Sequence, residues 1–287
     1  MSQIAWLILP FFFAKKVEAL IISQEGEAYQ PSYGLSSGML PRLPSGQALQ
    51  LLTSPRSGIL GTTVWPGASA LCSFLANRYS LKGKHCVDLG GRRIIKKLYA
   101  AALGAQSVML TDCRPPPDAA LYTTDGSPQL PEFGSSAILE LLEQNAQANR
   151  KLYPPDTDVR VTELDWTNES HRQQVASRGP NDGFDVVLAS DVTHFSQMHE
   201  PLADTIAHLL GETGGECIVS HQERMVTLGG QDMQLGGFVG TAMASGLEVD
   251  FLAVPSEEGN GSMNLNFDQS STASPSQRIT LLRLQLS

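Results

Sequence analysis

The feature that most constrains the fold is a strand–turn–helix–strand unit in residues 85–112. Its parts are, in order, an apolar strand at 85–89, the turn residues Gly90 and Gly91, a helix at 94–103 and an apolar strand at 107–112 that ends in Asp112. Two parallel strands joined by a helix form a βαβ unit, and a glycine turn after the first strand is typical of nucleotide-binding folds. The unit therefore predicts an α/β sheet that binds its ligand beyond the carboxyl ends of the strands.

The same alternation of apolar strands and helices runs through most of the remaining chain. The further expected elements are helices at 67–79, 136–152, 201–210 and 238–245 and strands at 159–164, 184–190, 216–220, 248–254 and 278–285. Alternation of strands and helices along a chain predicts a mostly parallel sheet with helices on both faces. The last two strands have no such helix between them, and we expect them to form an antiparallel hairpin.

The chain is predicted to be one large domain with appendages. Residues 24–57 are rich in Gly, Pro and Ser, so residues 1–57 are assigned to an N-terminal extension and residues 58–287 to the domain. Within the domain, residues 113–134 are expected to be an insertion after the second strand, and residues 257–276 a flexible loop, because both are rich in loop-forming residues.

An apolar run at residues 4–14, interrupted by Pro10, bears on the location of the protein. A membrane-spanning helix needs about 20 apolar residues, so this run is too short. A signal peptide carries positive charge ahead of its apolar run, whereas Lys15 and Lys16 follow this one. We therefore expect an intracellular protein with no membrane partner, placed in the cytoplasm and with the nucleus as a second compartment.

Charge and cysteine usage argue against several classes of function. The formal net charge of −9 disfavours a nucleic-acid partner, which needs a basic surface, but an acidic surface can attract a basic protein. The four cysteines include no CxxC pair, and Cys86 and Cys217 fall in expected core strands. Buried thiols are therefore expected rather than disulfides or a zinc site, and no metal is predicted.

Six short segments, in their order and spacing, carry a family resemblance. They are residues 64–75, 87–90, 103–112, 145–149, 164–166 and 189–195. Between residue 61 and about residue 224, the chain resembles the seven-β-strand (class I) protein-lysine methyltransferases of the methyltransferase-like group. The resemblance implies a Rossmann-like class I methyltransferase fold with seven strands, helices on both faces and an antiparallel C-terminal strand. It also implies S-adenosyl-L-methionine (SAM) as cofactor and a protein substrate, with lysine as the methyl acceptor.

The resemblance further implies a set of cofactor-binding residues. The set is Trp65, Asp88, Gly90, Gly91, Asp112, Asp165, Trp166 and Ser190. Asp112 would accept hydrogen bonds from the ribose hydroxyls, and its distance from the first strand, roughly 20 residues, matches the dinucleotide-binding fingerprint. Asp165 and Trp166 would flank the adenine, and Trp65 would close over the cofactor. Plainer roles remain open: Asp112 as a loop acid or helix cap, Trp166 as a core side chain and Trp65 as a loop anchor.

Asp191 and His194 are the candidate catalytic residues, at a place where the family usually has Asp-x-x-Tyr. Methyl transfer to an amine is a direct displacement that needs a neutral, aligned nucleophile, so orientation can supply much of the catalysis. A carboxylate can position the amine, and a histidine, which titrates in the physiological range, can accept its proton. A surface histidine that follows a strand is the alternative interpretation of His194.

The glycine loop departs from the family pattern of acid-x-Gly-x-Gly-x-Gly. Arg92 and Ile94 replace two of its glycines, although backbone that approaches a ligand closely favours glycine and a branched residue fits poorly there. Lys96 and Lys97 occupy helix positions that are normally apolar or small. Three explanations are open: a remodelled loop that still binds SAM, a catalytically inactive binding protein of the same fold, or an erroneous reading of the gene across residues 91–97.

Two other enzyme classes fit the residues less well. A nicotinamide-dependent oxidoreductase needs G-x-G-x-x-G, which residues 90–95 do not supply. A metal hydrolase could use His194 and His199 with Asp191, but the chain has no HExxH-type spacing.

Overall fold

The structure is a computed structural model of the 287-residue chain. The residues it describes are 42–50, 66–90, 95–113, 121–122, 128–129, 137–211, 214–223, 232–252 and 279–287. All of these residues belong to one compact unit. The apolar run at 4–14 and the expected flexible loop at 257–276 lie outside the described residues.

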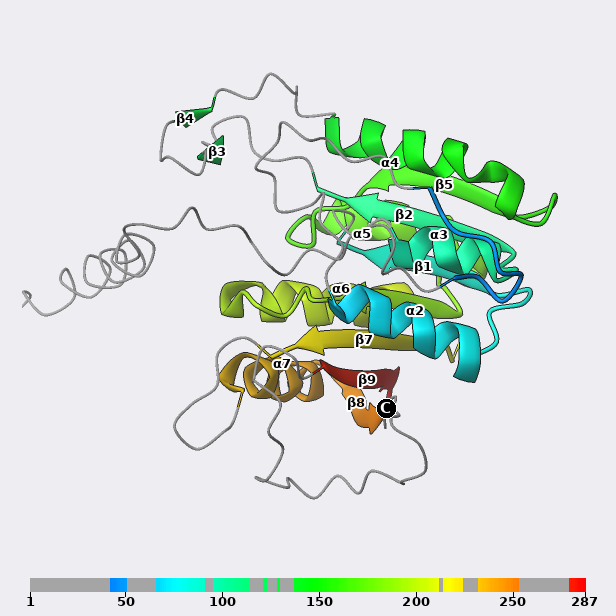
Figure 1. The fold of residues 1–287 in the computed structure, drawn as a ribbon. Helices are drawn as coiled ribbons and strands as arrows, with labels where there is room; N and C mark the ends of the chain where they lie inside the picture. The colour runs from blue at the N-terminus through cyan, green and yellow to red at the C-terminus, as the bar shows by residue number, and fades with distance from the viewer. Residues whose placement is uncertain are drawn as a thin grey trace, which may run out of the picture. The chain divides into compact units, whose positions relative to one another are not determined.

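Seven strands of the described residues form one sheet, in the order β5-β2-β1-β6-β7-β9-β8 (Figure 1). They are β1 (His85–Leu89), β2 (Ser107–Asp112), β5 (Asp158–Glu163), β6 (Val186–Ser190), β7 (Glu216–Gln222), β8 (Leu247–Leu252) and β9 (Ile279–Leu286). The pairs from β5 to β7 are parallel, and β9 is antiparallel to both β7 and β8. The strand order reverses between β1 and β6, and such a switch point is where open α/β sheets bind their ligands.

Helices cover both faces of this sheet and enclose two apolar cores. They are α2 (Pro66–Arg78), α3 (Ile95–Ala102) and α4 (Ala137–Ala148) on one face, and α5 (Glu169–Ala176), α6 (His199–Leu210) and α7 (Met233–Ala244) on the other. Alternate residues of a strand face opposite cores, so Cys86 packs with the first group of helices and Val87 with the second. This arrangement confirms the predicted fold class.

The strands agree with their predicted bounds to within two residues at either end, whereas three helices and one hairpin do not. The helix predicted at 136–152 ends at Ala148 as α4, and a 3₁₀ turn at Arg150–Leu152 follows it. The short α5 was missed because only Val175 and Ala176 of it are buried, so it has almost no apolar pattern. The start of α7 was predicted too late, because Gly236 and Gly237 lie inside the helix and Asp232 caps it. In the insertion, the two-residue strands β3 (Leu121–Tyr122) and β4 (Pro128–Gln129) pair antiparallel.

Residues 42–50, which the sequence assigned to the N-terminal extension, pack on the sheet domain. Leu43 and Leu49 are buried in the same core as α2 and α3. The Asn149 side chain binds both backbone groups of Gln50, accepting from its N–H at 2.8 Å and donating to its carbonyl at 2.7 Å. Asn149 belongs to one of the family-like segments, and its role in the structure is to hold this stretch of chain.

Cys86 and Cys217 are buried thiols in core strands, as the sequence predicts. Cys72 is also buried, and Cys113 is exposed. Burial raises the pKa of the Cys86 thiol to about 12, so this thiol stays protonated and unreactive at neutral pH.

No helix within the described ranges is long and apolar enough to cross a bilayer.

Candidate functional site

The candidate site lies at the switch point of the sheet, beyond the carboxyl ends of β1 and β6. Gly90 directly follows β1 and Asp191 directly follows β6, and β1 pairs with β6 in parallel. Asp112 is the last residue of the neighbouring β2, and Asp165 lies just beyond β5. Four parallel strands therefore bring sequence-predicted residues to one edge, although these residues are far apart in the chain.

Gly90 is a position that only glycine fits. Its φ of +82° lies in the left-handed region, and an added Cβ would stand 2.8 Å from Cγ1 of Val192 and 3.8 Å from Cζ2 of Trp166. The Gly90 backbone therefore lies against the loop that follows β6 and beside the indole predicted to flank an adenine. The half-buried Trp166 also packs on the apolar core, as its plainer interpretation expects, and its role toward adenine stays a prediction.

Asp88 lies under this glycine turn as the centre of a buried charge cluster. Its side chain and those of Lys96 and Lys97 are 0% exposed, and the two ammonium groups lie 2.9 Å from Oδ1 and Oδ2 of the carboxylate, respectively. Lys96 Nζ also donates to the carbonyl of Leu89 at 3.2 Å, and Lys97 Nζ to that of Thr111 at 3.1 Å. The lysines that look misplaced in the sequence thus tie α3 to the ends of β1 and β2.

The cluster changes the expected role of Asp88. Burial raises the pKa of its carboxyl group, and the charges and hydrogen bonds of Lys96 and Lys97 oppose that rise. Because two ammonium groups hold the fully buried carboxylate, any contact of Asp88 with a cofactor would have to come from its backbone. The side chain instead positions the start of the glycine loop.

Asp112 and Asp165 both lie at the strand-end edge and both bind backbone locally. Asp112 is 5% exposed, and its Oδ1 accepts from the N–H of Cys113 at 2.8 Å. Asp165 Oδ1 accepts from the backbone N–H and the hydroxyl of Thr167, at 2.9 and 2.7 Å. These bonds fix the orientation of both acids, and their roles toward ribose and adenine stay predictions.

Three further residues were predicted to bind the cofactor. Trp65 and Gly91 lie outside the described residues, and Ser190 is the buried last residue of β6.

Asp191 is held on several sides where the chain leaves β6. Its φ of 51° is in the left-handed region, which aspartate tolerates better than most residues. Its N–H donates to the carbonyl of Ser220 at 2.7 Å, and its Oδ1 accepts from the N–H of Gln222 at 2.8 Å, so the end of β7 fixes it from one side. From the other side, α2 approaches so closely that a Cβ on Gly67 would stand 2.5 Å from Asp191 Oδ2.

This close approach gives a prediction for Gly67→Ala. The added methyl group would overlap the Asp191 carboxylate, so we expect the free energy of unfolding to fall by about 1–3 kcal/mol, as in other overpacked cores. The matched control is Gly236→Ala in α7, where nothing lies within 4 Å of an added Cβ and a gain of roughly 0.5–1 kcal/mol is expected. Urea unfolding of both variants measures the difference, and equal stabilities would contradict the packing described here.

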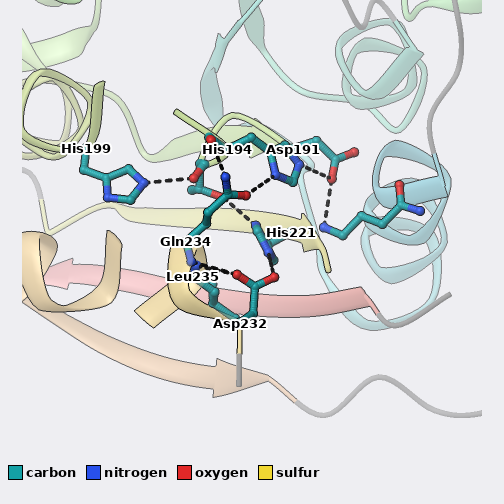
Figure 2. A network of polar contacts seen from close by, with 9 residues as sticks. Asp191, His194, His199, His221, Asp232, Gln234 and Leu235 are labelled. Atoms are coloured by element: carbon teal, nitrogen blue, oxygen red, sulfur yellow. Dashed lines mark hydrogen bonds and ion pairs between the residues drawn. The ribbon is translucent and has the colours of Figure 1, made fainter. Parts of the chain in front are cut away.

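His194 lies next to Asp191 and is bound by Gln234 of α7 (Figure 2). Its Nε2 is 3.7 Å from Asp191 Oδ1, and its Nδ1 is 3.2 Å from Gln234 Oε1. Gln234 Nε2 donates to the His194 carbonyl at 2.8 Å. The His194 side chain is 8% exposed, so it is not the surface histidine considered as an alternative. The structure therefore brings the two predicted catalytic residues together.

A second layer of polar residues supports this pair and was not predicted. His221, on β7, bonds the Thr193 hydroxyl through Nδ1 at 2.6 Å and Asp232 Oδ2 through Nε2 at 2.9 Å. His199 Nε2 donates to the Thr193 carbonyl at 2.9 Å, and the His221 ring lies 4.9 Å from that of His194 (Figure 2). The only signal in the sequence was the clustering of polar residues at 191–199 and 221–234, which by itself names no partners.

Asp232 gives a prediction about pH. Burial alone would raise the pKa of its carboxyl group, but the hydrogen bonds from His221 and from the N–H groups of Leu235 and Gln234 outweigh it, so the pKa is lowered. A lowered carboxyl pKa contributes stability above its unfolded value, about 3.9, and that contribution is lost as pH falls through the folded value.

The corresponding variant is Asp232→Ala, which also removes the N-cap of α7. At pH 7 we expect it to lower the free energy of unfolding by roughly 1–2 kcal/mol, and the difference from wild type should shrink below about pH 4. Asp232→Asn is the control that keeps the cap oxygen and removes the charge. Urea unfolding between pH 3 and pH 7 checks this expectation, which a difference independent of pH would contradict.

No group of three or more His, Cys, Asp and Glu side chains is arranged to hold a metal ion in the part of the chain that the structure describes. Asp191 and His194, with their supporting hydrogen bonds, lie at this edge beside the glycine turn.

The strand order, with β9 antiparallel between β7 and β8, defines a Rossmann-like methyltransferase fold. Residues 133–232 match the family model described as lysine methyltransferase. This match and the relatives below confirm the resemblance inferred from the sequence segments.

Three curated relatives have names that agree with this family. The protein N-lysine methyltransferase METTL21A of Danio rerio is 27% identical, over 56% of this chain and 59% of its own length. The calmodulin-lysine N-methyltransferase of Arabidopsis thaliana is 27% identical, over 51% and 40%. The protein-lysine methyltransferase METTL21E of Mus musculus is 30% identical, over 53% and 53%. The chain thus spans about half the length of the curated relatives it matches.

Among solved structures, the ribosomal protein L11 methylase of Lactobacillus delbrueckii subsp. bulgaricus is 16% identical, with a TM-score of 0.42 over 76% of this chain and 77% of that one. So distant a likeness carries no argument about activity.

Proposed function

We propose that this protein is a SAM-dependent methyltransferase that transfers a methyl group to a protein side chain, with lysine as the acceptor. The observation that carries the proposal is the meeting, at the switch point of the sheet, of a glycine turn and an Asp–His pair. Val192, between the two catalytic candidates, is the side chain that an added Cβ on Gly90 would meet at 2.8 Å. The residues suited to cofactor binding therefore adjoin the residues suited to handling an amine.

The residues at the strand ends fit a SAM molecule in their chemistry. Gly90 offers backbone without a side chain, the Trp166 indole lies beside it, and Asp112 and Asp165 supply carboxylates at the next two strand ends. An aromatic face suits a purine, and carboxylates suit ribose hydroxyls and an exocyclic amine. When bound, SAM supplies a methyl group on a positively charged sulfur, which is activated for displacement.

The Asp191 and His194 side chains would manage the amine. A lysine reaches the site as an ammonium ion, and the Asp191 carboxylate, whose side chain is 0% exposed, would attract and orient it. To become a nucleophile, the amine must lose a proton. His194 Nε2 lies 3.7 Å from Asp191 Oδ1, and the imidazole would accept the proton. The resulting imidazolium would be stabilised by the adjacent carboxylate.

The proposal also covers the kind of substrate and the cellular location of the protein. Names of relatives that refer to protein and calmodulin lysines support a protein substrate, and the net charge of −9 favours a basic one over nucleic acid. Buried free thiols suit a reducing compartment, so we place the protein in the cytoplasm, with the nucleus as a second location. Cell fractionation with an antibody to the protein tests that placement.

The direct test of the proposed function is transfer of labelled methyl groups. The purified protein is incubated with isotopically labelled SAM and a cytosolic extract, and the modified proteins are mapped by mass spectrometry. We expect label on lysine side chains of particular proteins. Label on another residue type would correct the acceptor, and no label above a sample without the protein would contradict the proposal.

A further inference from the structure

Gln234 forms a two-point contact with His194 that determines which ring nitrogen carries the proton. The backbone carbonyl of His194 can only accept a hydrogen bond, so the amide atom 2.8 Å from it must be the NH₂ group of Gln234. The other amide atom is then the oxygen, which lies 3.2 Å from His194 Nδ1. An amide oxygen can only accept, so His194 Nδ1 must carry a hydrogen to make this contact.

The position of Gln234 is itself fixed by the start of α7. Asp232 Oδ1 accepts from the N–H groups of Gln234 and Leu235, at 2.8 and 3.0 Å, and so caps the helix. Asp232 Oδ2 is bound in turn by His221, 2.9 Å away. The amide is thus carried by a capped helix end rather than by a free loop (Figure 2).

A proton on Nδ1 has a consequence for the other ring nitrogen. In the neutral ring, a hydrogen on Nδ1 leaves the lone pair on Nε2, the atom that lies 3.7 Å from Asp191 Oδ1. Without Gln234, a hydrogen on Nε2 could point at the Asp191 carboxylate, and the lone pair would turn to the opposite side of the ring. Among the described residues, His194 lies against the Asp191 carboxylate, the Gln234 amide and the His221 ring.

We infer that Gln234 is a positioning residue, which holds the His194 proton on Nδ1 and so leaves the lone pair of the neutral ring on Nε2, where it would accept the proton of the methyl acceptor. This role rests on the proposed function, because it assigns a base to the same site. The tautomer itself does not depend on catalysis, so it can be measured whether or not methyl transfer is detected. In other enzymes, the group that fixes the tautomer of a histidine base has a large effect on the rate, because an enzyme with that histidine in the wrong tautomer loses most of its activity.

The first test is the nitrogen NMR spectrum of the histidine rings in protein labelled with ¹⁵N, recorded at a pH where His194 is neutral. His194→Gln identifies the signals. In wild type, we expect the His194 proton on Nδ1, and in Gln234→Met, which keeps the length of the side chain and removes both polar atoms, we expect it to move to Nε2. A wild-type proton on Nε2, or an unchanged tautomer in Gln234→Met, would overturn the inference.

The second test separates positioning from general damage to the site. If the protein transfers methyl groups, Gln234→Met should lower kcat by roughly 10- to 100-fold and leave KM nearly unchanged, because only proton acceptance is impaired. The matched control is Met233→Ala, the adjacent and 65% exposed residue of the same helix, with wild-type kcat expected. Equal kcat in Gln234→Met and wild type would overturn the inference. Absence of transfer by wild type would contradict the proposed function. The tautomer measurement alone would then decide whether Gln234 holds the proton on His194 Nδ1.

Discussion

Asp88→Asn is expected to lower the free energy of unfolding by about 3–5 kcal/mol, because it leaves two buried ammonium groups without their carboxylate. The three side chains are 0% exposed, and each lysine lies 2.9 Å from one carboxylate oxygen. Asparagine has nearly the same shape, so the loss comes from charge rather than from a cavity. Urea unfolding at pH 7, compared with wild type, measures it.

The control for this prediction removes all the charges together. In the triple variant Asp88→Leu, Lys96→Met, Lys97→Met, no buried charge is left, and replacement of buried ion pairs by apolar residues is often neutral or stabilising. The triple variant should therefore be more stable than Asp88→Asn, although it carries more substitutions. A triple variant less stable than the single one would contradict the buried cluster.

Asp191→Asn is expected to lower the rate of methyl transfer roughly 100-fold or more, in the range found when a group that orients or stabilises reacting charge is removed. The carboxylate lies 3.7 Å from His194 Nε2, at the proposed site of the amine. The measurement is initial-rate transfer of labelled methyl groups to the identified protein substrate, with kcat and KM determined separately.

Asparagine is chosen at this position because it also tolerates the left-handed backbone that residue 191 adopts, with a φ of 51°. Its side-chain oxygen can still accept from the N–H of Gln222, so the fold should be kept. An unchanged melting temperature with lost activity supports the assigned role. Wild-type activity in a folded Asp191→Asn protein would remove Asp191 from the catalytic residues.

The inner strand β6 could be predicted from the sequence because it is apolar along almost its whole length. Residues 186–190 are buried without exception, so no periodicity had to be interpreted. The start of α7 could not be predicted in the same way. Two glycines inside the helix suggest a loop, and the Asp232 cap that outweighs them is visible only once its bonds to the helix N–H groups are known.

The site residues that directly follow strand ends could be predicted from the sequence. Their hydrogen-bond and ion-pair partners from distant parts of the chain could not. Asp191 and His194 follow a buried strand directly, and parallel pairing places Gly90 and Asp112 at the same edge. The partners Gln234 and His221 come from other elements, and no spacing rule connects them with residue 194. Lys96 and Lys97 looked unsuited to a buried helix face, because the pairing of both with Asp88 exists only in three dimensions.

Binding of S-adenosylhomocysteine to the purified chain, measured by isothermal titration calorimetry, shows whether the site at the strand ends accepts the cofactor, and Asp112→Ala is the matched variant. We expect a dissociation constant on the order of micromolar for wild type and at least about tenfold weaker binding for the variant, equivalent to ~1.4 kcal/mol or more. Circular dichroism of both proteins establishes that they are folded. No binding by folded wild type would contradict the account, and would leave a protein that has the methyltransferase fold without the activity.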